Sequence, residues 1–354
     1  MRKILYLIMT DQIEGKWVSI FKRILYLSSL FYGALVKLSY WCYQERLCPQ
    51  YELGKPVVSV GNITWGGVGK TPFVELIAKL VKEQNRLPAI LIRGYKGKKK
   101  DPTALNIESD EALSYQTSLK GVPIGIGKDR FQKSEEILQN SPVDVFLLDD
   151  GFQHWRIKRN LNIVLIDATN PFGNGFLIPR GILREPLSAV SRADLIVITK
   201  SDIGKDNIAH IKDALSRFKN IPILESIHRP EYLWDLRGNS IVDLSFIRDK
   251  PICSFCSIGD PKSFERTLVS LGVQLTKNFV FMDHHWYSHQ DISQIIKFCS
   301  TQGIDTLVTT NKDAVKLKEF ENLWDNNLKI FALKIQIQII HGKDELFNRI
   351  LRLL

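Results

Sequence analysis

Cysteine is scarce in this chain, and the few positions it occupies argue against two kinds of site. The sequence contains 5 cysteines, an odd number with no second close pair that would complete a zinc site. Cys253 and Cys256 have C-x-x-C spacing, but they lie in an apolar run with strand character, where alternation does not place both thiols on one face. We therefore expect two buried apolar cysteines and a reducing, cytosolic environment rather than a redox pair.

The chain also has little that would let it cross a bilayer or bind nucleic acid. The uncharged stretch between Arg23 and Lys37 is shorter than the ~20 apolar residues that a transmembrane helix needs. Internal repeats, low-complexity tracts and nucleic-acid-binding motifs are missing. The formal net charge of +10 therefore favours an anionic lipid surface or a phosphorylated substrate over nucleic acid. Residues 1–10 show no small-residue cleavage pattern, so we expect no removable signal peptide.

What the chain has instead is an alternation of β-rich runs and helical stretches. A hydrophobic content of 44% with 24% charged residues is typical of a folded globular protein. We expect strands at 57–60, 89–92, 143–148, 163–166, 195–199, 252–257, 305–309 and 329–333, and helices at 73–84, 110–118, 130–139, 206–218, 261–271 and 289–300. This alternation predicts parallel sheets with helices on both faces. The polar segment 225–249 indicates a connection between two α/β units. We expect a helical segment over 1–50 and domains over 51–230 and 231–354.

The N-terminal segment combines apolar, aromatic and basic residues with helical spacing. One apolar stripe contains Ile20, Ile24, Leu27, Phe31, Leu35, Leu38 and Cys42. Lysine and arginine flank this stripe, and the accompanying tryptophans and tyrosines suit a membrane interface. Three interpretations are open: a helix lying in the interface, a helix packed on the domain core, and a single-span anchor. The first explains stripe, aromatics and charge together, so we favour it.

The strongest signal for function is a glycine-rich segment between a predicted strand and a predicted helix. Residues 61–72 are Gly-Asn-Ile-Thr-Trp-Gly-Gly-Val-Gly-Lys-Thr-Pro. Glycines let backbone N–H groups turn toward phosphates, and the N-terminus of the following helix adds partial positive charge. Lys70 can reach the outer phosphates, and the Thr71 hydroxyl can bind Mg²⁺. Thr64 stands where the usual pattern begins with glycine, but the strand-to-helix context favours a P-loop over an ordinary glycine-rich turn.

Acidic residues further along the chain suit such a loop. Asp149 and Asp150 end an apolar run, and paired carboxylates at the end of a strand can hold Mg²⁺ directly or through water. Asp110 opens a predicted helix, where plain N-capping is the simpler explanation. The sequence Asp-His-His at 283–285 has no further ligand pattern that would support a metal site. Thr-Lys-Ser-Asp at 199–202 matches a base-reading motif of GTPases over four residues, too short a match to predict GTP specificity.

Several blocks along the chain agree with one known family. They run in order from residue 59 to residue 314: Ser59 through Pro72, Arg93-Gly94-Tyr95, Ser109-Asp110-Glu111-Ala112, Val122-Pro123, Gly127-Lys128-Asp129-Arg130, Asp149-Asp150-Gly151-Phe152-Gln153-His154, Pro171-Phe172-Gly173-Asn174-Gly175, Leu183-Arg184-Glu185-Pro186-Leu187, Asp283-His284-His285, Thr309-Thr310 and Lys312-Asp313-Ala314. With these blocks the chain resembles the tetraacyldisaccharide 4′-kinases of lipid A synthesis. In that family the P-loop also lacks its first glycine. Asn311 stands where the family is expected to have glutamate.

The resemblance implies an activity, a fold and a location. The activity is ATP-dependent transfer of the γ-phosphoryl group to the 4′-hydroxyl of a tetraacylated glucosamine disaccharide 1-phosphate, which gives lipid IVA. The fold is α/β, with two α/β/α units joined by a short β linker, the first a P-loop NTPase-like parallel sheet, and an N-terminal amphipathic helix. The location is peripheral, on the cytoplasmic face of the bacterial inner membrane, in contact with anionic lipid. We expect the lipid disaccharide as partner, with neither nucleic acid nor an obligatory protein partner.

The resemblance also implies roles for individual residues. Lys70 would neutralise the migrating phosphoryl group, and Asp110 would receive the hydroxyl proton with His284 orienting or tuning it and Asp283 supporting that loop. The implied ligands of Mg²⁺ are Thr71, Asp149 and Asp150. The residues implied to bind ATP are Gly66, Gly67, Val68, Gly69, Lys70, Thr71, Gln153 and Glu185.

Apart from the resemblance, the residues themselves indicate a membrane-associated P-loop nucleotide enzyme. The main alternative is a membrane-associated P-loop NTPase switch that hydrolyses nucleotide to control a partner. A non-catalytic membrane adaptor is a third class, but it would have no need of Lys70, Asp149 and Asp110.

Overall fold

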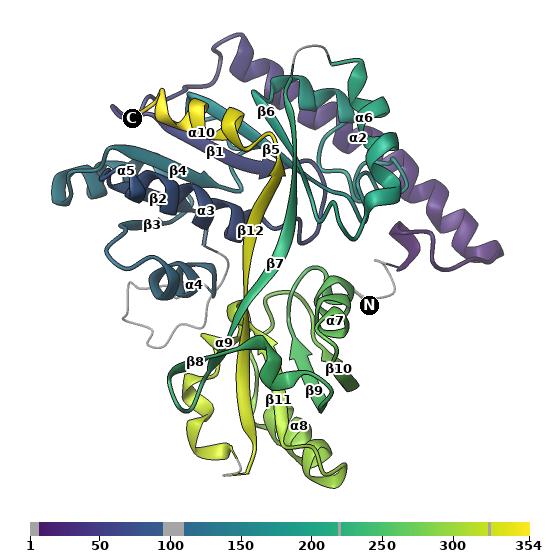
Figure 1. The fold of residues 1–354 in the computed structure, drawn as a ribbon. Helices are drawn as coiled ribbons and strands as arrows, with labels where there is room; N and C mark the ends of the chain where they lie inside the picture. The colour runs from purple at the N-terminus through teal and green to yellow at the C-terminus, as the bar shows by residue number, and fades with distance from the viewer. Residues whose placement is uncertain (1–6, 95–109, 219–220, 325–326) are drawn as a thin grey trace. The chain divides into compact units, whose positions relative to one another are not determined.

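Two long strands, β7 (Ile223–Asp235) and β12 (Lys329–His341), connect the two units into which the chain divides (Figure 1). The computed structural model describes residues 7–94, 110–218, 221–324 and 327–354. Unit 1 comprises Met1–Arg93, Val122–Ile227 and Gln338–Leu354, and unit 2 comprises Gly94–Gly121 and His228–Ile337. The two long strands are neighbours in the sheet, and each passes from one unit into the other.

Unit 1 contains a parallel sheet built from the apolar runs of the sequence. Its strands lie in the order β6-β5-β1-β4-β2-β3. Their bounds are β1 (Val57–Asn62), β2 (Pro88–Ile92), β3 (Ile124–Ile126), β4 (Val145–Asp149), β5 (Leu161–Asp167) and β6 (Leu195–Thr199). All of these strands except β3 are buried along their whole length, as expected when helices cover both faces of a parallel sheet. Because parallel strands end on one edge, the polar residues that follow them gather there.

The end of β1 and the segment after β4 approach each other closely. The register pairs Val60 of β1 with Asp149 of β4, so the loops that follow the two strands begin side by side. A side chain at Gly61 would place its Cβ 2.5 Å from the Cβ of Phe152, well inside the contact distance of two carbon atoms. Glycine at position 61 therefore permits this approach.

Unit 1 also contains helices. They are α2 (Lys16–Gln44), α3 (Lys70–Glu83), α5 (Arg130–Asn140), α6 (Ile208–Ser216) and α10 (Lys343–Leu351), with the 3₁₀ helices η1 (Leu187–Arg192) and η2 (Lys205–Asn207). In α3 the buried Phe73, Ile77 and Val81 recur every four residues and form the face that packs on the sheet. Helix α5 starts at Arg130 because the Asp129 carboxylate accepts the N–H of Gln132.

Unit 2 contains a second set of parallel strands, in the order β10-β9-β11-β12. Its elements are β8 (Ser240–Val242), β9 (Pro251–Cys256), β10 (Gln274–Val280), β11 (Thr306–Thr310), α4 (Asp110–Ser118), α7 (Pro261–Ser270), α8 (His289–Thr301), α9 (Asn311–Ala314), η3 (Leu244–Ile247) and η4 (Lys318–Leu323). Cys253 packs in a buried cluster with Ile295 of α8, and Cys256 packs in another with Leu268 of α7. Both thiols are free and buried, which confirms that they are separate apolar core residues.

The structure confirms the predicted fold class, and each predicted strand and helix is present with its ends shifted by a few residues, except that β12 continues to His341, well beyond the predicted end at 333. The predicted connection at 225–249 begins within β7, which passes from unit 1 into unit 2, and this strand was not among the predicted ones. Glu225, Arg229 and Glu231 of β7 are partly or fully exposed and share one face of the strand, while Leu224 and Ser226 on the other face are buried. The predicted domain bounds at residues 50 and 230 stay a prediction. Tyr95 and Ser109 lie outside the described residues.

Helix α2 turns most of its apolar side chains outward. Its buried residues are Leu25, Ser29 and Gly33, a narrow stripe with a spacing of four. The predicted stripe is exposed instead: Ile20 by 51%, Ile24 by 55%, Leu27 by 66%, Phe31 by 68%, Leu35 by 46% and Leu38 by 55%. These residues therefore do not pack on the core. Within the described part of the chain, α2 is the one helix long and apolar enough to cross a membrane, by length and composition only.

Candidate functional site

The glycine-rich segment forms the loop between β1 and α3, as predicted. Gly66 and Gly69 have φ angles of 139° and 88°, which non-glycine residues rarely adopt. Helix α3 begins at Lys70, and Thr71 follows in its first turn. The loop thus ends at a helix N-terminus, where backbone N–H groups without partners in the helix favour an anion.

Lys70 is held between the ends of two neighbouring strands. Its Nζ donates to Oδ1 of Asn62, the last residue of β1, at 3.1 Å. It also lies 3.4 Å from Oδ1 of Asp150, which follows β4, and its side chain is 15% exposed. These two contacts fix the ammonium group beside the first turn of α3, within reach of an anion bound by the loop.

The two carboxylates predicted to end a strand do so. Asp149 is the last residue of β4 and is buried, and Asp150 follows with a φ of 51°. Arg184 Nη1 donates to both oxygens of Asp150, at 2.8 and 3.0 Å. Burial alone would raise the pKa of Asp150, but Lys70 and Arg184 outweigh burial and lower it to about 2. Asp150 is therefore ionised throughout the neutral range.

Gln153 and Glu185 belong to the same network. Gln153 Nε2 donates to the backbone oxygen of Asn62 at 2.9 Å and to Oε1 of Glu185 at 3.0 Å. The Glu185 carboxylate is buried and accepts from Arg192 Nη2 at 2.8 Å. Asn62 also accepts a hydrogen bond from Lys70. Hydrogen bonds therefore connect the P-loop lysine, through these residues, to Arg192 of η1.

The oxygen atoms around the P-loop fit a hard divalent cation. The Thr71 hydroxyl comes from the first turn of α3, and the carboxylates of Asp149 and Asp150 come from the end of β4, the strand paired with β1. Mg²⁺ prefers such oxygen ligands and usually keeps several waters and phosphate oxygens besides one or two carboxylates. In the described residues no group of three His, Cys, Asp or Glu side chains could hold a metal by itself.

The inward face of α2 contacts the segment that carries Arg184 and Glu185. The Tyr32 hydroxyl donates to the backbone oxygen of Arg184 at 2.9 Å. The guanidinium of Arg192 lies 4.5 Å from the ring centroid of Tyr40 and 4.4 Å from that of Phe152, within cation–π range. One helix therefore supports the P-loop network with one face and exposes an apolar stripe with the other.

The second set of predicted residues meets in unit 2. Asp110 is the first residue of α4 and is buried. His284, whose φ is 60°, places Nδ1 at 3.0 and 2.9 Å from the two oxygens of Asp110. Burial would raise the pKa of Asp110, but the His284 hydrogen bond and the charge of Lys312 hold it well below its usual range. The N-capping explanation is thus insufficient, because the carboxylate has a specific imidazole partner 174 residues away in sequence.

Two lysines complete this group in unit 2. Lys316 Nζ lies 3.4 Å and Lys312 Nζ 3.6 Å from Asp110 Oδ2. Lys312 also contacts Asp283 at 3.1 Å, which places Asp283 in the cluster. Lys316 has a fully buried side chain and donates to Ser257 Oγ at 2.7 Å and to Asp313 Oδ1 at 3.1 Å. The Asp110 carboxylate therefore lies among three groups that can carry positive charge.

Arg184, Lys312 and Lys316 were not predicted as site residues. Arg184 and Lys312 lie in the blocks 183–187 and 312–314 that carry the family resemblance, so a signal for them was present. Lys316 follows the block at 312–314 by two residues and had no signal of its own, because its role depends on a fold that brings α4 and α9 together.

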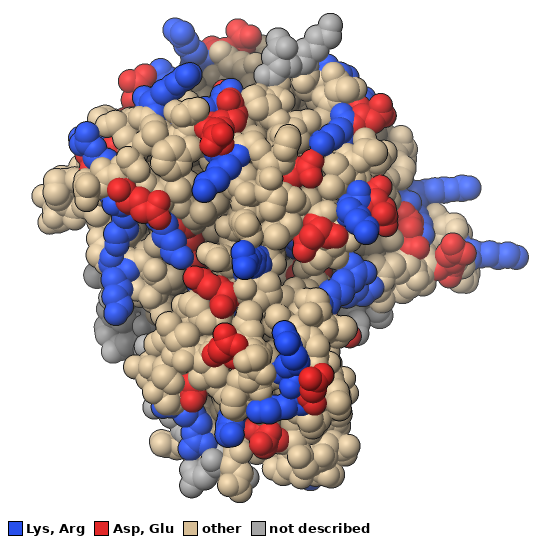
Figure 2. Space-filling view, in the orientation of Figure 1, with Lys and Arg blue, Asp and Glu red and all other residues tan. Residues whose placement is uncertain are grey.

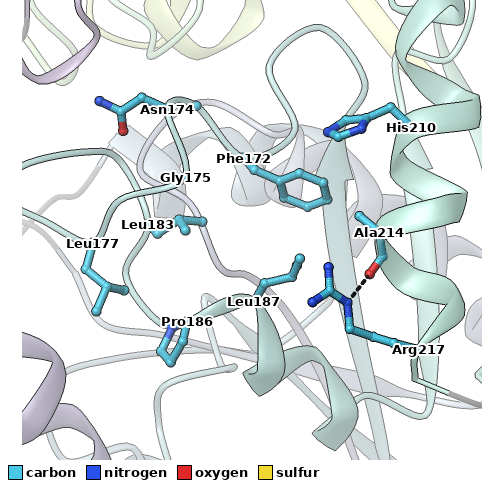
Figure 3. Close-up of a pocket in the computed structure, with 11 residues that line it drawn as sticks. Phe172, Asn174, Gly175, Leu177, Leu183, Pro186, Leu187, His210, Ala214 and Arg217 are labelled. Carbon is cyan, nitrogen blue, oxygen red and sulfur yellow. Dashed lines mark hydrogen bonds between the residues drawn. The ribbon is translucent and has the colours of Figure 1, made fainter.

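A cavity of about 390 Å³ lies elsewhere in unit 1 (Figure 3). One wall is formed by His210, Ala214 and Arg217, and the other by Phe172, Gly173, Asn174, Gly175, Leu177, Leu183, Pro186 and Leu187. Arg217 Nε donates to the backbone oxygen of Ala214 at 3.0 Å. None of the predicted catalytic, ATP-binding or metal-binding residues lines this cavity, so it is not the site that the P-loop predicts.

His154 follows the acidic pair and lies in an electropositive environment. Burial, together with the charges of Arg130, Arg159 and Arg156, lowers its pKa to about 3. The imidazole is therefore neutral in the folded protein at any pH above that value.

Comparison with known proteins identifies what the chain is similar to. A family model described as tetraacyldisaccharide-1-P 4′-kinase matches residues 21–354. A tetraacyldisaccharide 4′-kinase of Syntrophus aciditrophicus is 37% identical over 324 residues, which is 86% of each chain. One from Elusimicrobium minutum is 38% identical over 91% of this chain and 88% of its own. The crystal structure of the "apo" form of LpxK from Aquifex aeolicus in complex with ATP matches with a TM-score of 0.74 and 28% identity, over 94% of this chain and 99% of that one.

Neutral His154 predicts an acid-sensitive fold. The unfolded chain binds a proton at this imidazole near pH 6.5, whereas the folded chain binds it only near pH 3. The free energy of unfolding should therefore fall as the pH drops below 6.5, by up to about 1.4 kcal/mol per pH unit. Urea denaturation at pH 6.5, 5.5 and 4.5 measures this slope.

His154→Gln should flatten that slope between pH 6.5 and 4.5, while His210→Gln, a change at an exposed histidine, should keep it. An unchanged slope in His154→Gln would show that other groups cause the acid sensitivity.

Proposed function

Because the chain belongs to the tetraacyldisaccharide-1-phosphate 4′-kinase family, we propose that it transfers the γ-phosphoryl group of ATP to the 4′-hydroxyl of a tetraacylated disaccharide 1-phosphate. The single observation that carries this proposal is the placement of Lys70. Its ammonium lies at the start of α3, fixed by Asn62 and Asp150. Phosphoryl transfer depends on alignment and on stabilising negative charge, which a fixed cation at a phosphate-binding loop supplies.

The residues around Lys70 have supporting roles in this proposal. Asp150 pairs with both Arg184 and Lys70, so the Lys70 ammonium stays in place before and after transfer. Gln153 and Glu185 anchor the end of β1 through Asn62. The loop of Gly66, Gly67, Val68 and Gly69 and the N-terminus of α3 would bind the phosphates. Thr71, Asp149 and Asp150 would hold Mg²⁺, which when bound supplies neutralisation of phosphate charge.

Asp110 is proposed to receive the proton of the acceptor hydroxyl. Its low pKa makes it a weak base. A weak base is sufficient where the transition state is loose, since the hydroxyl gives up its proton late. His284 holds both carboxylate oxygens in one orientation, and Lys312 and Lys316 keep the carboxylate ionised. The carboxylate and the imidazole would thus act as one unit.

A double-mutant cycle tests this pairing. Asp110→Asn keeps the shape but removes the proton acceptor, so kcat should fall about 10²–10⁴-fold while ATP affinity stays within about threefold. His284→Ala should lower kcat through the same step, and the double variant should be little worse than the poorer single variant. Fully multiplicative losses would contradict a coupled pair. Asp291→Asn, which breaks the neighbouring pair with His285, is the matched control and should keep kcat.

We further propose that the protein is peripheral, on the cytoplasmic face of the inner membrane, with α2 lying in the interface. The exposed stripe from Ile20 to Leu38 supplies apolar insertion. Arg23 and Lys37, both exposed on the same helix, supply attraction to anionic lipid, whereas Lys22 is paired with Asp11 at 2.6 Å. Figure 2 shows positive and negative side chains interspersed over the visible face. Such docking would bring the enzyme to an amphiphilic acceptor.

Substitutions in the exposed stripe test this docking without removing the packing face of α2. Leu27→Ser, Phe31→Ser and Leu38→Ser together should weaken binding to vesicles containing phosphatidylglycerol by at least about 100-fold, because each apolar side chain contributes about 1.5–3 kcal/mol when buried. Co-sedimentation measures the binding. Ile241→Ser, Val269→Ser and Val280→Ser remove exposed apolar groups of unit 2 and should bind vesicles normally. Equal binding by both triple variants would contradict docking through α2.

One assay separates this kinase from the alternative, a membrane-associated P-loop switch. The protein is incubated with ATP, Mg²⁺ and a tetraacyl disaccharide 1-phosphate, and the lipid is analysed by mass spectrometry. The proposal predicts a lipid heavier by one phosphoryl group, with fragmentation placing that group on the distal sugar. Lys70→Met should lose this product. Consumption of ATP with no change in the lipid would contradict the proposal and favour the switch.

A further inference from the structure

Lys200 is a buried cation for which the proposed reaction gives no role. It follows β6 directly, is 2% exposed and has a φ of 54°. Both features are unusual: lysine is seldom fully buried without a partner, and the left-handed region is uncommon for a residue other than glycine. Since β6, the adjacent strand β5 and the next strand β1 are parallel and end on the same edge, Lys200 begins its loop close to the P-loop.

The side chains that end β6 bind the backbone of the P-loop. Lys200 Nζ donates to the backbone oxygen of Gly67 at 3.1 Å. Thr199 Oγ1, fully buried, donates to the backbone oxygen of Val68 at 3.0 Å. Two consecutive side chains thus hold the carbonyls of two consecutive residues in the phosphate-binding loop.

These contacts orient the peptide groups of the loop. In a trans peptide the C=O and the following N–H point in opposite directions. A Val68 carbonyl bound by Thr199 therefore directs the N–H of Gly69 away from β6. Lys200 likewise fixes the preceding peptide group, which joins Gly67 and Val68, through its carbonyl. The N–H of that peptide group belongs to Val68 and donates to the Gly66 carbonyl at 3.2 Å, which closes the turn. A loop that binds phosphate through N–H groups gains affinity when those groups are already oriented.

The charge of Lys200 is balanced by a carboxylate that is itself fixed. Lys200 Nζ contacts Oδ2 of Asp167, the last residue of β5. The other oxygen of Asp167 accepts from the backbone N–H of Thr169 at 2.8 Å and from its hydroxyl at 2.7 Å. The pair is buried on both sides, so Asp167 holds Lys200 in place and Lys200 holds Gly67.

We propose that Lys200 is a positioning residue of the nucleotide site, which together with Asp167 and Thr199 orients the P-loop backbone for the phosphates. This inference rests on the proposed nucleotide site and extends it to the Thr-Lys-Ser-Asp segment at 199–202. In this proposal Thr199 and Lys200 act by holding the phosphate-binding loop, and not by reading the nucleotide base.

The test measures nucleotide binding directly, without turnover. A fluorescent ATP analogue is titrated into each variant, both with Mg²⁺ and with a chelator. Lys200→Met alone would leave Asp167 buried without its cation, which destabilises a fold by itself. The deciding variant is therefore Lys200→Met with Asp167→Asn, which removes both charges and keeps an acceptor for Thr169. We expect the Kd of this variant for the ATP analogue to rise at least tenfold, while its melting temperature stays close to that of the wild-type protein.

Two further variants keep the test decisive. Thr199→Val removes one hydroxyl without changing the shape and should raise Kd about three- to tenfold, the range for one hydrogen bond. Lys205→Met makes the same change at an exposed lysine of η2 and should leave Kd unchanged. If the double variant does not fold, Thr199→Val decides. Folded variants that bind nucleotide within twofold of the unchanged protein would overturn the inference. If the wild-type protein itself bound no nucleotide, this would instead contradict the proposed function.

Discussion

The balance of charge at the carboxyl edge of the unit 1 sheet is the constraint on which the site depends. Parallel strands β1, β4, β5 and β6 end together, so Asp150, Asp167, Lys70 and Lys200 follow them within a small region. Two of the acids there have specific cations, Asp150 with Lys70 and Arg184, and Asp167 with Lys200. Partly buried charges are tolerated when they are paired in this way. The pairing also fixes the P-loop and its lysine.

Helix α2 contacts the proposed nucleotide site with one face and exposes apolar side chains, proposed to meet the membrane, on the other. Tyr32 and Tyr40 on its inward face contact Arg184 and Arg192, whereas the stripe from Ile20 to Leu38 faces outward. The narrow packing stripe depends on small residues, because Gly33 lies so near Leu177 that a Cβ there would come within 2.7 Å of its side chain. Because α2 packs this closely on unit 1, a helix α2 bound at the membrane interface would also hold unit 1 there.

Periodicity and local context were enough to predict the P-loop, the strands on either side of it and the carboxylates after β4. These features depend on neighbours in sequence, such as the glycines before Lys70 and the apolar run before Asp149. β7 was less visible, because an element with polar residues on one face has a composition close to that of a loop. Pairing Asp110 with His284 needed the family resemblance, since the two residues are 174 positions apart. Lys316 and Lys200 were missed as functional groups because their partners come from other strands and helices.

The central claim is that ATP consumption is coupled to phosphorylation of the lipid acceptor. The most direct measurement is the ratio of ADP to phosphorylated disaccharide, followed over time in one reaction with ATP, Mg²⁺ and acceptor. The account predicts that the two products appear in equal amounts. It also predicts that little ADP forms when the acceptor is omitted, because Asp110 then has no acceptor hydroxyl from which to take a proton. ADP that forms at the same rate with and without acceptor would contradict the account.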